Sequence, residues 1–372
     1  MLTKIKKHSS TLLSCCAVTF GLLAGAQQAM ADNCYIMVHG HGTQGDVKNG
    51  SYQPALDYWK DSHFDEYQNG NFYSYLIGPN DNYGVVGYDS TDESGFPYWY
   101  DQTAGEIARQ MISIKQGNGD GFTHPESNTQ CSANDTFYVV AHSQGALQMV
   151  YMSGNALPGS PNYNTTWTAN ETLTVDFESA FTNIDAIFTL GGAISGTEGA
   201  DRVCNGNWLD SLINAAFLGK DCNASVEWMQ TYDSYLARNT IGTNLAAPIY
   251  VMGGYKSFPG IEGASAGMLT GEDDGYINLA SQMGCAGSAK RPLWDDLNQY
   301  KTFWGIAYGS PIFRCNNDNK GTPRTYNMAS VYTDHDAERN AGIPYPDYTS
   351  IDNGMTCGNG QNMAGRIAAC TE

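Results

Sequence analysis

Short apolar runs rich in β-branched and aromatic residues recur along the chain, and we interpret them as buried strands. They cover residues 34–38, 84–88, 137–140, 184–190 and 248–252. Segments with apolar residues at helical spacing predict helices over 54–59 and 104–114, and a further helix that begins near Ala146. Strands that alternate with helices predict a mostly parallel central sheet with helices on both faces.

The first 31 residues have the pattern of a secretory signal peptide. Three lysines within the first seven residues precede an apolar stretch over 11–24, and residues 29–31 read Ala-Met-Ala. The apolar stretch is too short to span a bilayer. We therefore expect cleavage near Ala31, a secreted chain (extracellular or periplasmic) and no stable membrane anchor.

The mature chain, residues 32–372, is long enough for a single α/β domain with insertions, and no linker or repeat divides it. Residues 196–247 contain two segments with a strongly apolar helical face. This pattern predicts a helical cap or lid, and helices that pack onto the core of an insertion explain it equally well. Residues 345–372 form a tail with two cysteines.

Cysteines indicate an oxidising compartment. Two of the ten lie in the signal peptide, and the remaining eight are an even number in an exported chain, which predicts up to four disulfides. The connectivity stays open, although Cys204 with Cys222 and Cys357 with Cys370 would close short local loops.

The chain is strongly acidic. Loss of the three signal-peptide lysines takes the net charge from −19 to −22. Such a surface repels nucleic acid and anionic membranes, which excludes nucleic acid as a partner. It is also compatible with bound calcium.

Candidate chemistry begins with Ala141-His142-Ser143-Gln144-Gly145, which lies between the strand at 137–140 and the helix that follows. A serine on a tight turn between strand and helix is typical of a nucleophile elbow, and the turn requires small residues on both sides of the serine. Gly145 meets this requirement, and Ala141 departs mildly from the G-x-S-x-G form. Ser143 is therefore the predicted nucleophile.

The base follows from the order of residues along the chain. Nucleophile elbows of this kind occur in α/β-hydrolases, where the order is serine, acid, histidine. Of seven histidines, His335 alone follows Ser143. His142 adjoins the nucleophile, and we expect its side chain to point elsewhere on the turn.

The acid is expected between Ser143 and His335, on the loop beyond the strand at 248–252. That loop contains Glu272, Asp273 and Asp274. Three adjacent carboxylates are also typical of a solvated turn or a calcium site. Asp274 is the predicted acid, partly through the resemblance described below, and Asp273 stays open.

An oxyanion hole needs two backbone N–H groups. One is expected from Gln144, directly after the nucleophile, and the other from His41, in the loop after the first strand. His39 and His41 also admit a metal-binding interpretation, although no H-E-x-x-H helix or carboxylate cluster accompanies them.

Several motifs, in the right order over about residues 34–340, resemble the secreted bacterial true lipases of the α/β-hydrolase superfamily. Residues 35–40 are similar to the strand and oxyanion loop of these triacylglycerol lipases, and 55–59 to the helix with a Tyr-Trp pair. Residues 189–197 are similar to their T-x-G-T-P-H-x-G-S segment, with Gly-Ala-Ile in place of T-P-H, and 274–277 to their D-G-x-V acid motif.

The resemblance implies an α/β-hydrolase fold and a lipase or esterase that acts on an ester or lipid through an acyl-enzyme. It requires no cofactor for the chemistry, and it allows a structural Ca²⁺ near Asp336. The same residues serve acyltransferases, thioesterases and polyester depolymerases. A catalytically inert surface-binding scaffold is the alternative of a different class, and its signature, a missing triad member, is absent from the sequence.

Overall fold

The structure is a computed structural model. It describes residues 32–40, 53–60, 82–88, 90, 101–117, 131–160, 162–167, 173–194, 196–197, 245–255, 269, 273–285, 297–299, 313–315, 325–331, 334–335, 338 and 367. The predicted signal peptide, most of the predicted cap and nearly all of the tail lie outside these residues.

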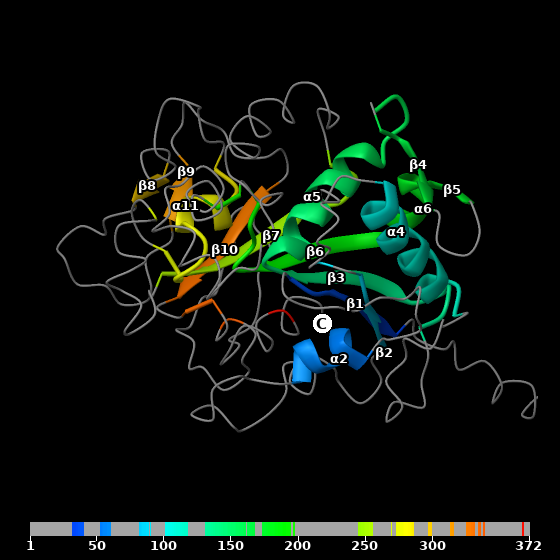
Figure 1. Cartoon of the computed structure of the whole chain (residues 1–372), viewed down its shortest axis with the longest axis horizontal. Coiled ribbons are helices and arrows are strands. Elements are labelled where there is room, and N and C mark those ends of the chain that lie inside the picture. Colours follow the sequence, from blue (N-terminus) through cyan, green and yellow to red (C-terminus); the bar gives the residue numbers. More distant parts are fainter. Residues whose placement is uncertain are drawn as a thin grey trace, which may run out of the picture.

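A six-stranded sheet organises the described part of the chain, in the order β2-β1-β3-β6-β7-β10 (Figure 1). Every neighbouring pair in it is parallel. The strands are β1 (Asn33–Val38), β2 (Asn82–Val86), β3 (Thr136–His142), β6 (Ile184–Leu190), β7 (Ile249–Gly254) and β10 (Thr325–Val331). All carboxyl ends therefore meet at one edge of the sheet, where active sites of such folds lie.

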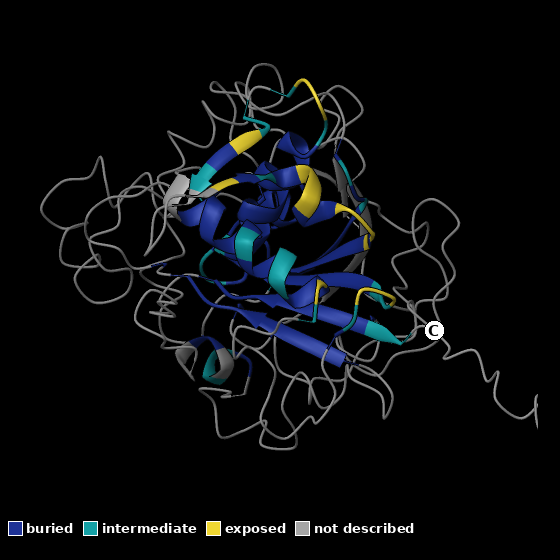
Figure 2. Ribbon diagram, turned by 90° about the vertical axis from the view of Figure 1, so that its right-hand side faces the viewer, coloured by how far each residue is buried: buried dark blue, intermediate teal, exposed yellow. Residues whose placement is uncertain are grey.

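Helices cover both faces of this sheet. Figures 1 and 2 show α4 (Asp101–Lys115) and α5 (Gln144–Asn155) on one face and α2 (Gln53–Lys60) on the other. The stripe Ile107, Met111 and Ile114 that predicted α4 is buried. Because helices pack on both faces, the central strands are buried over nearly their whole length, with Asp185 in β6 exposed, which explains their apolar runs.

Shorter elements flank the sheet. They are α6 (Phe177–Phe181), α11 (Leu279–Gln282) and two antiparallel pairs: β4 (Asn164–Trp167) with β5 (Leu173–Asp176), and β8 (Leu297–Gln299) with β9 (Phe313–Cys315).

One disulfide joins Cys34 to Cys131 and thereby fastens the start of β1 to the segment that leads into β3. Cys285 also forms a disulfide. The other predicted local pairings lie outside the described residues. Within the described residues, no helix is both long and apolar enough to cross a membrane.

The predicted fold is confirmed: a parallel sheet, helices on both faces and a strand-turn-helix elbow at Ser143 make an α/β-hydrolase fold. The sequence did not predict β10, whose residues Thr-Tyr-Asn-Met-Ala-Ser-Val mix polar and apolar positions. This strand pairs with β7 at the end of the sheet, and its register shifts between Asn327 and Ala329.

Candidate active site

The turn between β3 and α5 holds Ser143 in a backbone conformation that L-residues rarely adopt, with φ 55° and ψ −124°. Hydrogen bonds to β6 and its continuation fix this turn. The Ser143 N–H donates to the Leu190 carbonyl at 3.1 Å, and the Ser143 carbonyl accepts from the Ala193 N–H at 3.0 Å. A strained, pinned serine at the carboxyl edge is the geometry of a nucleophile elbow.

Two glycines allow the backbone to pass close to this turn. A Cβ on Gly145 would lie 2.5 Å from the His39 carbonyl oxygen and 2.6 Å from that of Val38. A Cβ on Gly40 would lie 2.6 Å from the Ser143 Cβ. The loop after β1 therefore packs directly against the nucleophile, which is where an oxyanion loop belongs.

Gln144 is the first residue of α5, so its N–H is one of the four that an α-helix leaves without an intrahelical acceptor. His41, the other predicted oxyanion donor, lies outside the described residues, one position beyond Gly40.

His39 is bound to the protein through both ring nitrogens. Its Nε2 accepts the Tyr88 N–H at 3.2 Å, and its Nδ1–H donates to the Gly40 carbonyl at 2.8 Å. Burial, with a smaller effect of nearby Tyr58, raises the pKa of Tyr88 well above its ordinary value, so its hydroxyl stays protonated and donates to the His39 carbonyl. His39 therefore stabilises the loop after β1, and neither nitrogen offers a lone pair to a metal.

Asp274 and His335, 61 residues apart, meet at the carboxyl edge. The His335 Nδ1–H donates to Asp274 Oδ2 at 2.6 Å, and the His335 backbone N–H donates to the Asp274 carbonyl at 3.0 Å. Both side chains are buried. With the proton on Nδ1, the lone pair of the ring is at Nε2, the nitrogen that a general base would use.

Asp274 and Asp273 have different partners. The second oxygen of Asp274 accepts the N–H groups of Tyr276 and Ile277 at 2.9 and 2.7 Å. The Asp273 carboxylate instead accepts the Gly275 N–H at 2.8 Å. Asp274 is thus the carboxylate that the fold brings to the histidine.

Gln282 ties the acid loop to the end of β7. Its side chain accepts the Gly254 N–H at 2.8 Å and donates to the carbonyls of Gly254 and Ile277. The turn that presents Asp274 is therefore anchored to the sheet in addition to the hydrogen bonds among its own residues.

Two consecutive residues, Leu190 and Gly191, lie next to both the Ser143 turn and His335. Leu190 accepts the Ser143 N–H, and a Cβ on the following Gly191 would lie 3.0 Å from His335 Nδ1. Gly191 has φ 48° and leaves space for the Glu338 carboxylate, which any side chain there would overlap.

Two further buried side chains, His142 and Glu338, lie next to His335, and the sequence did not indicate their position. We expected the His142 side chain to point elsewhere on the turn, but the centroid of its ring lies 4.5 Å from that of the His335 ring. Glu338 Oε2 lies 3.8 Å from His142 Nε2 and 3.9 Å from His335 Nδ1. The His-x-x-Glu spacing of His335 and Glu338 is visible in the sequence, but no local pattern indicates the contact with His142.

His142, His335 and Glu338 are close enough to surround a metal ion. The two ring nitrogens that face Glu338, however, are already used as donors, since His335 Nδ1 binds Asp274 and His142 Nε2 binds the His335 carbonyl at 3.0 Å. The donor set therefore fits a hydrogen-bonded network better than a metal centre. Asp336, near which we expected calcium, lies outside the described residues.

Comparisons with known proteins give structural similarity alone. No known protein family and no curated protein matches the sequence. The chain is similar to the mature form of the Bacillus licheniformis lipase BlEst2, with 13% identity, a TM-score of 0.45, and coverage of 83% of this chain and 87% of that one.

It is also similar to EstA from Clostridium botulinum (12% identity, TM-score 0.43, 85% of each chain) and to the Staphylococcus hyicus lipase (10%, 0.41, 83% of this chain and 89% of that one). Bacterial lipases are thus among the structures to which this chain is similar. The fold assignment itself rests on the sheet and elbow described above.

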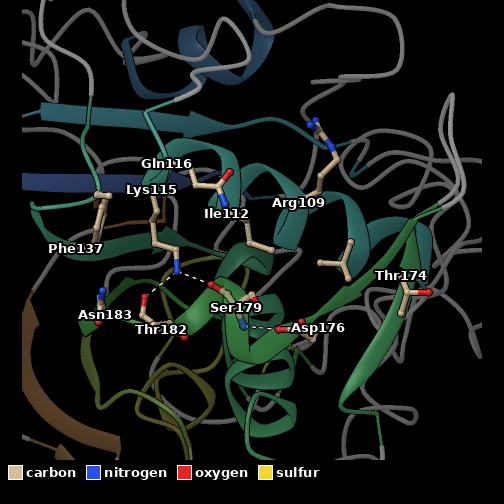
Figure 3. A pocket seen from close by; sticks show the side chains of 12 residues that line it. Arg109, Ile112, Lys115, Gln116, Phe137, Thr174, Asp176, Ser179, Thr182 and Asn183 are labelled. Atoms are coloured by element: carbon tan, nitrogen blue, oxygen red, sulfur yellow. Dashed lines mark hydrogen bonds between the residues drawn. The ribbon is translucent and has the colours of Figure 1, made fainter.

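The amino edge of the sheet holds a separate pocket of about 480 Å³, shown in Figure 3. Lys115 points into it and donates to the carbonyls of Ser179 and Thr182 at 2.6 and 2.8 Å. Burial lowers the pKa of Lys115 to about 8, against a smaller opposing effect of Asp176. None of its lining residues is a histidine or cysteine, and Lys115 acts as a cap on the end of α6.

Proposed function

We propose that the protein is a secreted serine hydrolase of carboxylic esters, with Ser143 as nucleophile, His335 as base and Asp274 as orienting acid. The observation that carries the proposal is the buried hydrogen bond between Asp274 and His335 at the same sheet edge as the strained elbow of Ser143. A serine, a base and an orienter in this arrangement form the minimum set for nucleophilic acyl transfer.

In the first half of the reaction, His335 Nε2 takes the Ser143 Oγ proton as the oxygen attacks the ester carbonyl. The N–H groups of Gln144 and His41 stabilise the oxyanion of the tetrahedral intermediate. Asp274 keeps His335 in the productive tautomer and stabilises the imidazolium, which then protonates the leaving alcohol. The products are the free alcohol and an acyl-enzyme on Ser143.

In the second half, water replaces the alcohol. His335 removes a proton from the water, the resulting nucleophile attacks the acyl-enzyme carbonyl, and the intermediate collapses with return of the proton to Ser143. Each oxyanion donor contributes about 3 kcal/mol to such steps. The acid is released and the enzyme is regenerated.

The substrate class we propose is an ester or lipid, in agreement with the sequence motifs. The Cys34–Cys131 disulfide supports a protein that works outside the reducing cytosol. A structural Ca²⁺ near Asp336 belongs to the proposal as a stabilising ion that takes no part in the chemistry.

The experiment is hydrolysis of p-nitrophenyl esters from acetate to palmitate, with and without calcium. Ser143→Ala should lower kcat by on the order of 10⁴-fold or more. Ser160→Ala is the control, because Ser160 lies beyond the other end of α5, where its hydroxyl donates to the Gly154 carbonyl.

Equal rates for Ser143→Ala and the wild type would overturn the proposal. Turnover of thioesters, or transfer to added alcohols in preference to water, would redirect it to the acyltransferase or thioesterase alternatives. Inactivity of the correctly disulfide-bonded protein on every ester would favour the binding scaffold.

A further inference from the structure

His142 precedes the nucleophile, and its ring is only 1% exposed. It lies between two segments that are distant in sequence. Its Nδ1 is 2.5 Å from the Tyr58 hydroxyl on α2, and its Nε2 is 3.0 Å from the backbone carbonyl of His335. The residue beside the nucleophile therefore contacts the base directly.

The partners of His142 determine its tautomer. A carbonyl oxygen only accepts, so Nε2 must carry a proton and donate it to the His335 carbonyl. In the neutral ring, Nδ1 is then an acceptor, and the Tyr58 hydroxyl donates to it. The His335 carbonyl thus fixes the tautomer, and the Tyr58 hydroxyl holds the ring from its other side.

His335 is held from the acid side by two bonds to Asp274, through its ring and its backbone N–H. Those bonds fix His335 relative to Asp274, not relative to Ser143. The bond from His142 to the His335 carbonyl fixes His335 relative to Ser143, because His142 is the last residue of β3 and Ser143 follows it directly on the turn.

We propose that His142 is a positioning residue that sets the reach of His335 toward Ser143, with Tyr58 holding the His142 ring in place. This inference rests on the proposed function. A misplacement of about 1 Å costs on the order of 100-fold in rate, so loss of a contact that fixes the base should appear in kcat.

The test uses substitutions that place a donor at one or the other ring nitrogen. In His142→Gln the amide nitrogen lies near the Nε2 position and still reaches the His335 carbonyl. In His142→Asn it lies near the Nδ1 position and does not. We expect kcat for an ester to fall about 10- to 100-fold in the Asn variant and about threefold in the Gln variant, with KM within about twofold.

Tyr58→Phe is a second, milder variant that leaves His142 in place. It should lower kcat about three- to tenfold, because the ring then loses the hydrogen bond at Nδ1 and is free to turn away from the His335 carbonyl. Thermal unfolding of each variant separates a change in stability from one in kcat.

A merely structural histidine would give Asn and Gln variants with equal kcat, and that result would overturn the inference. The same conclusion follows if Tyr58→Phe keeps wild-type kcat. Failure of the proposed function has a different signature, since the wild type itself would then show no Ser143-dependent hydrolysis.

Discussion

The elbow that carries Ser143 and the loops that carry Asp274 and His335 lie at the same sheet edge, but they are assembled differently. The elbow forms within one strand-turn-helix unit, and close packing of backbone at Gly40 and Gly145 supports it. Asp274 and His335, the proposed acid and base, come from separate loops after β7 and β10, and side-chain hydrogen bonds join them. The elbow therefore depends on positions that have no side chain, whereas the pairing of Asp274 with His335 depends on polar side-chain atoms.

This difference explains why the sequence indicates the elbow more directly than it indicates Asp274 and His335. An elbow has a local signature, because the small residues and the serine are neighbours in the chain. The acid and base have no local signature, and chain order and resemblance alone indicated them. The two halves should therefore respond differently to substitution.

The largest expected effect is on the acid. Asp274→Asn should lower kcat by about 10³- to 10⁴-fold with little change in KM, because an amide leaves His335 in the wrong tautomer. Asp273→Asn, one residue away, is the matched control and should stay within about threefold of wild type. Ester kinetics on the two variants decide between the carboxylates, and a reversed ranking would contradict the geometry.

At the elbow, Gly145→Ala should damage folding and activity together. Its Cβ meets the backbone of β1, which cannot yield as a flexible side chain would. We expect a loss of about 1–3 kcal/mol in the free energy of unfolding and a fall in kcat of about 100-fold. Urea unfolding and ester kinetics measure the two effects.

Ala141→Gly is the companion change, because it restores the G-x-S-x-G form at a buried strand position. It should cost about 1 kcal/mol of stability and leave kcat unimproved. A gain in kcat would mean that Ala141 constrains the elbow.

Glu338→Gln tests the charge behind the base. A carboxylate 3.9 Å from His335 Nδ1 stabilises the imidazolium that forms in the transition state, in support of Asp274. The isosteric amide should lower kcat about tenfold. Glu178→Gln, an exposed carboxylate on α6, should have no effect, and equal behaviour of the two variants in ester kinetics would count against an electrostatic role.

The smallest effect on activity is expected at the amino edge, where Lys115→Met should leave kcat unchanged. Its effect is on stability. The pKa of Lys115 is lowered from 10.5 to about 8 in the folded protein, so the unfolded chain binds more protons between these values and wild-type stability rises with pH there.

Relative to Lys115→Met, the wild type should therefore gain up to about 3 kcal/mol in the free energy of unfolding from pH 8 to 10.5. Urea unfolding at the two pH values measures the gain. Parallel curves for the two proteins would contradict the lowered pKa.

Much of the fold was predictable because β1, β3, β6 and β7 are buried on both faces and therefore have continuous apolar sequences. β10 was not, since an end strand tolerates polar residues. At the site, the residues next to Ser143 in the chain were sufficient to predict its turn. The contact between His142 and His335 spans 193 residues and depends on the strand order, which no local pattern encodes.

The most direct measurement is the covalent reaction of the wild type with a fluorophosphonate, followed by peptide mapping, beside His335→Ala and Asp274→Asn. We expect one label on Ser143 in the wild type, slower labelling in Asp274→Asn and almost none in His335→Ala. Labelling of another residue, or labelling of Ser143 at the same rate in all three proteins, would contradict the assignment of nucleophile, acid and base.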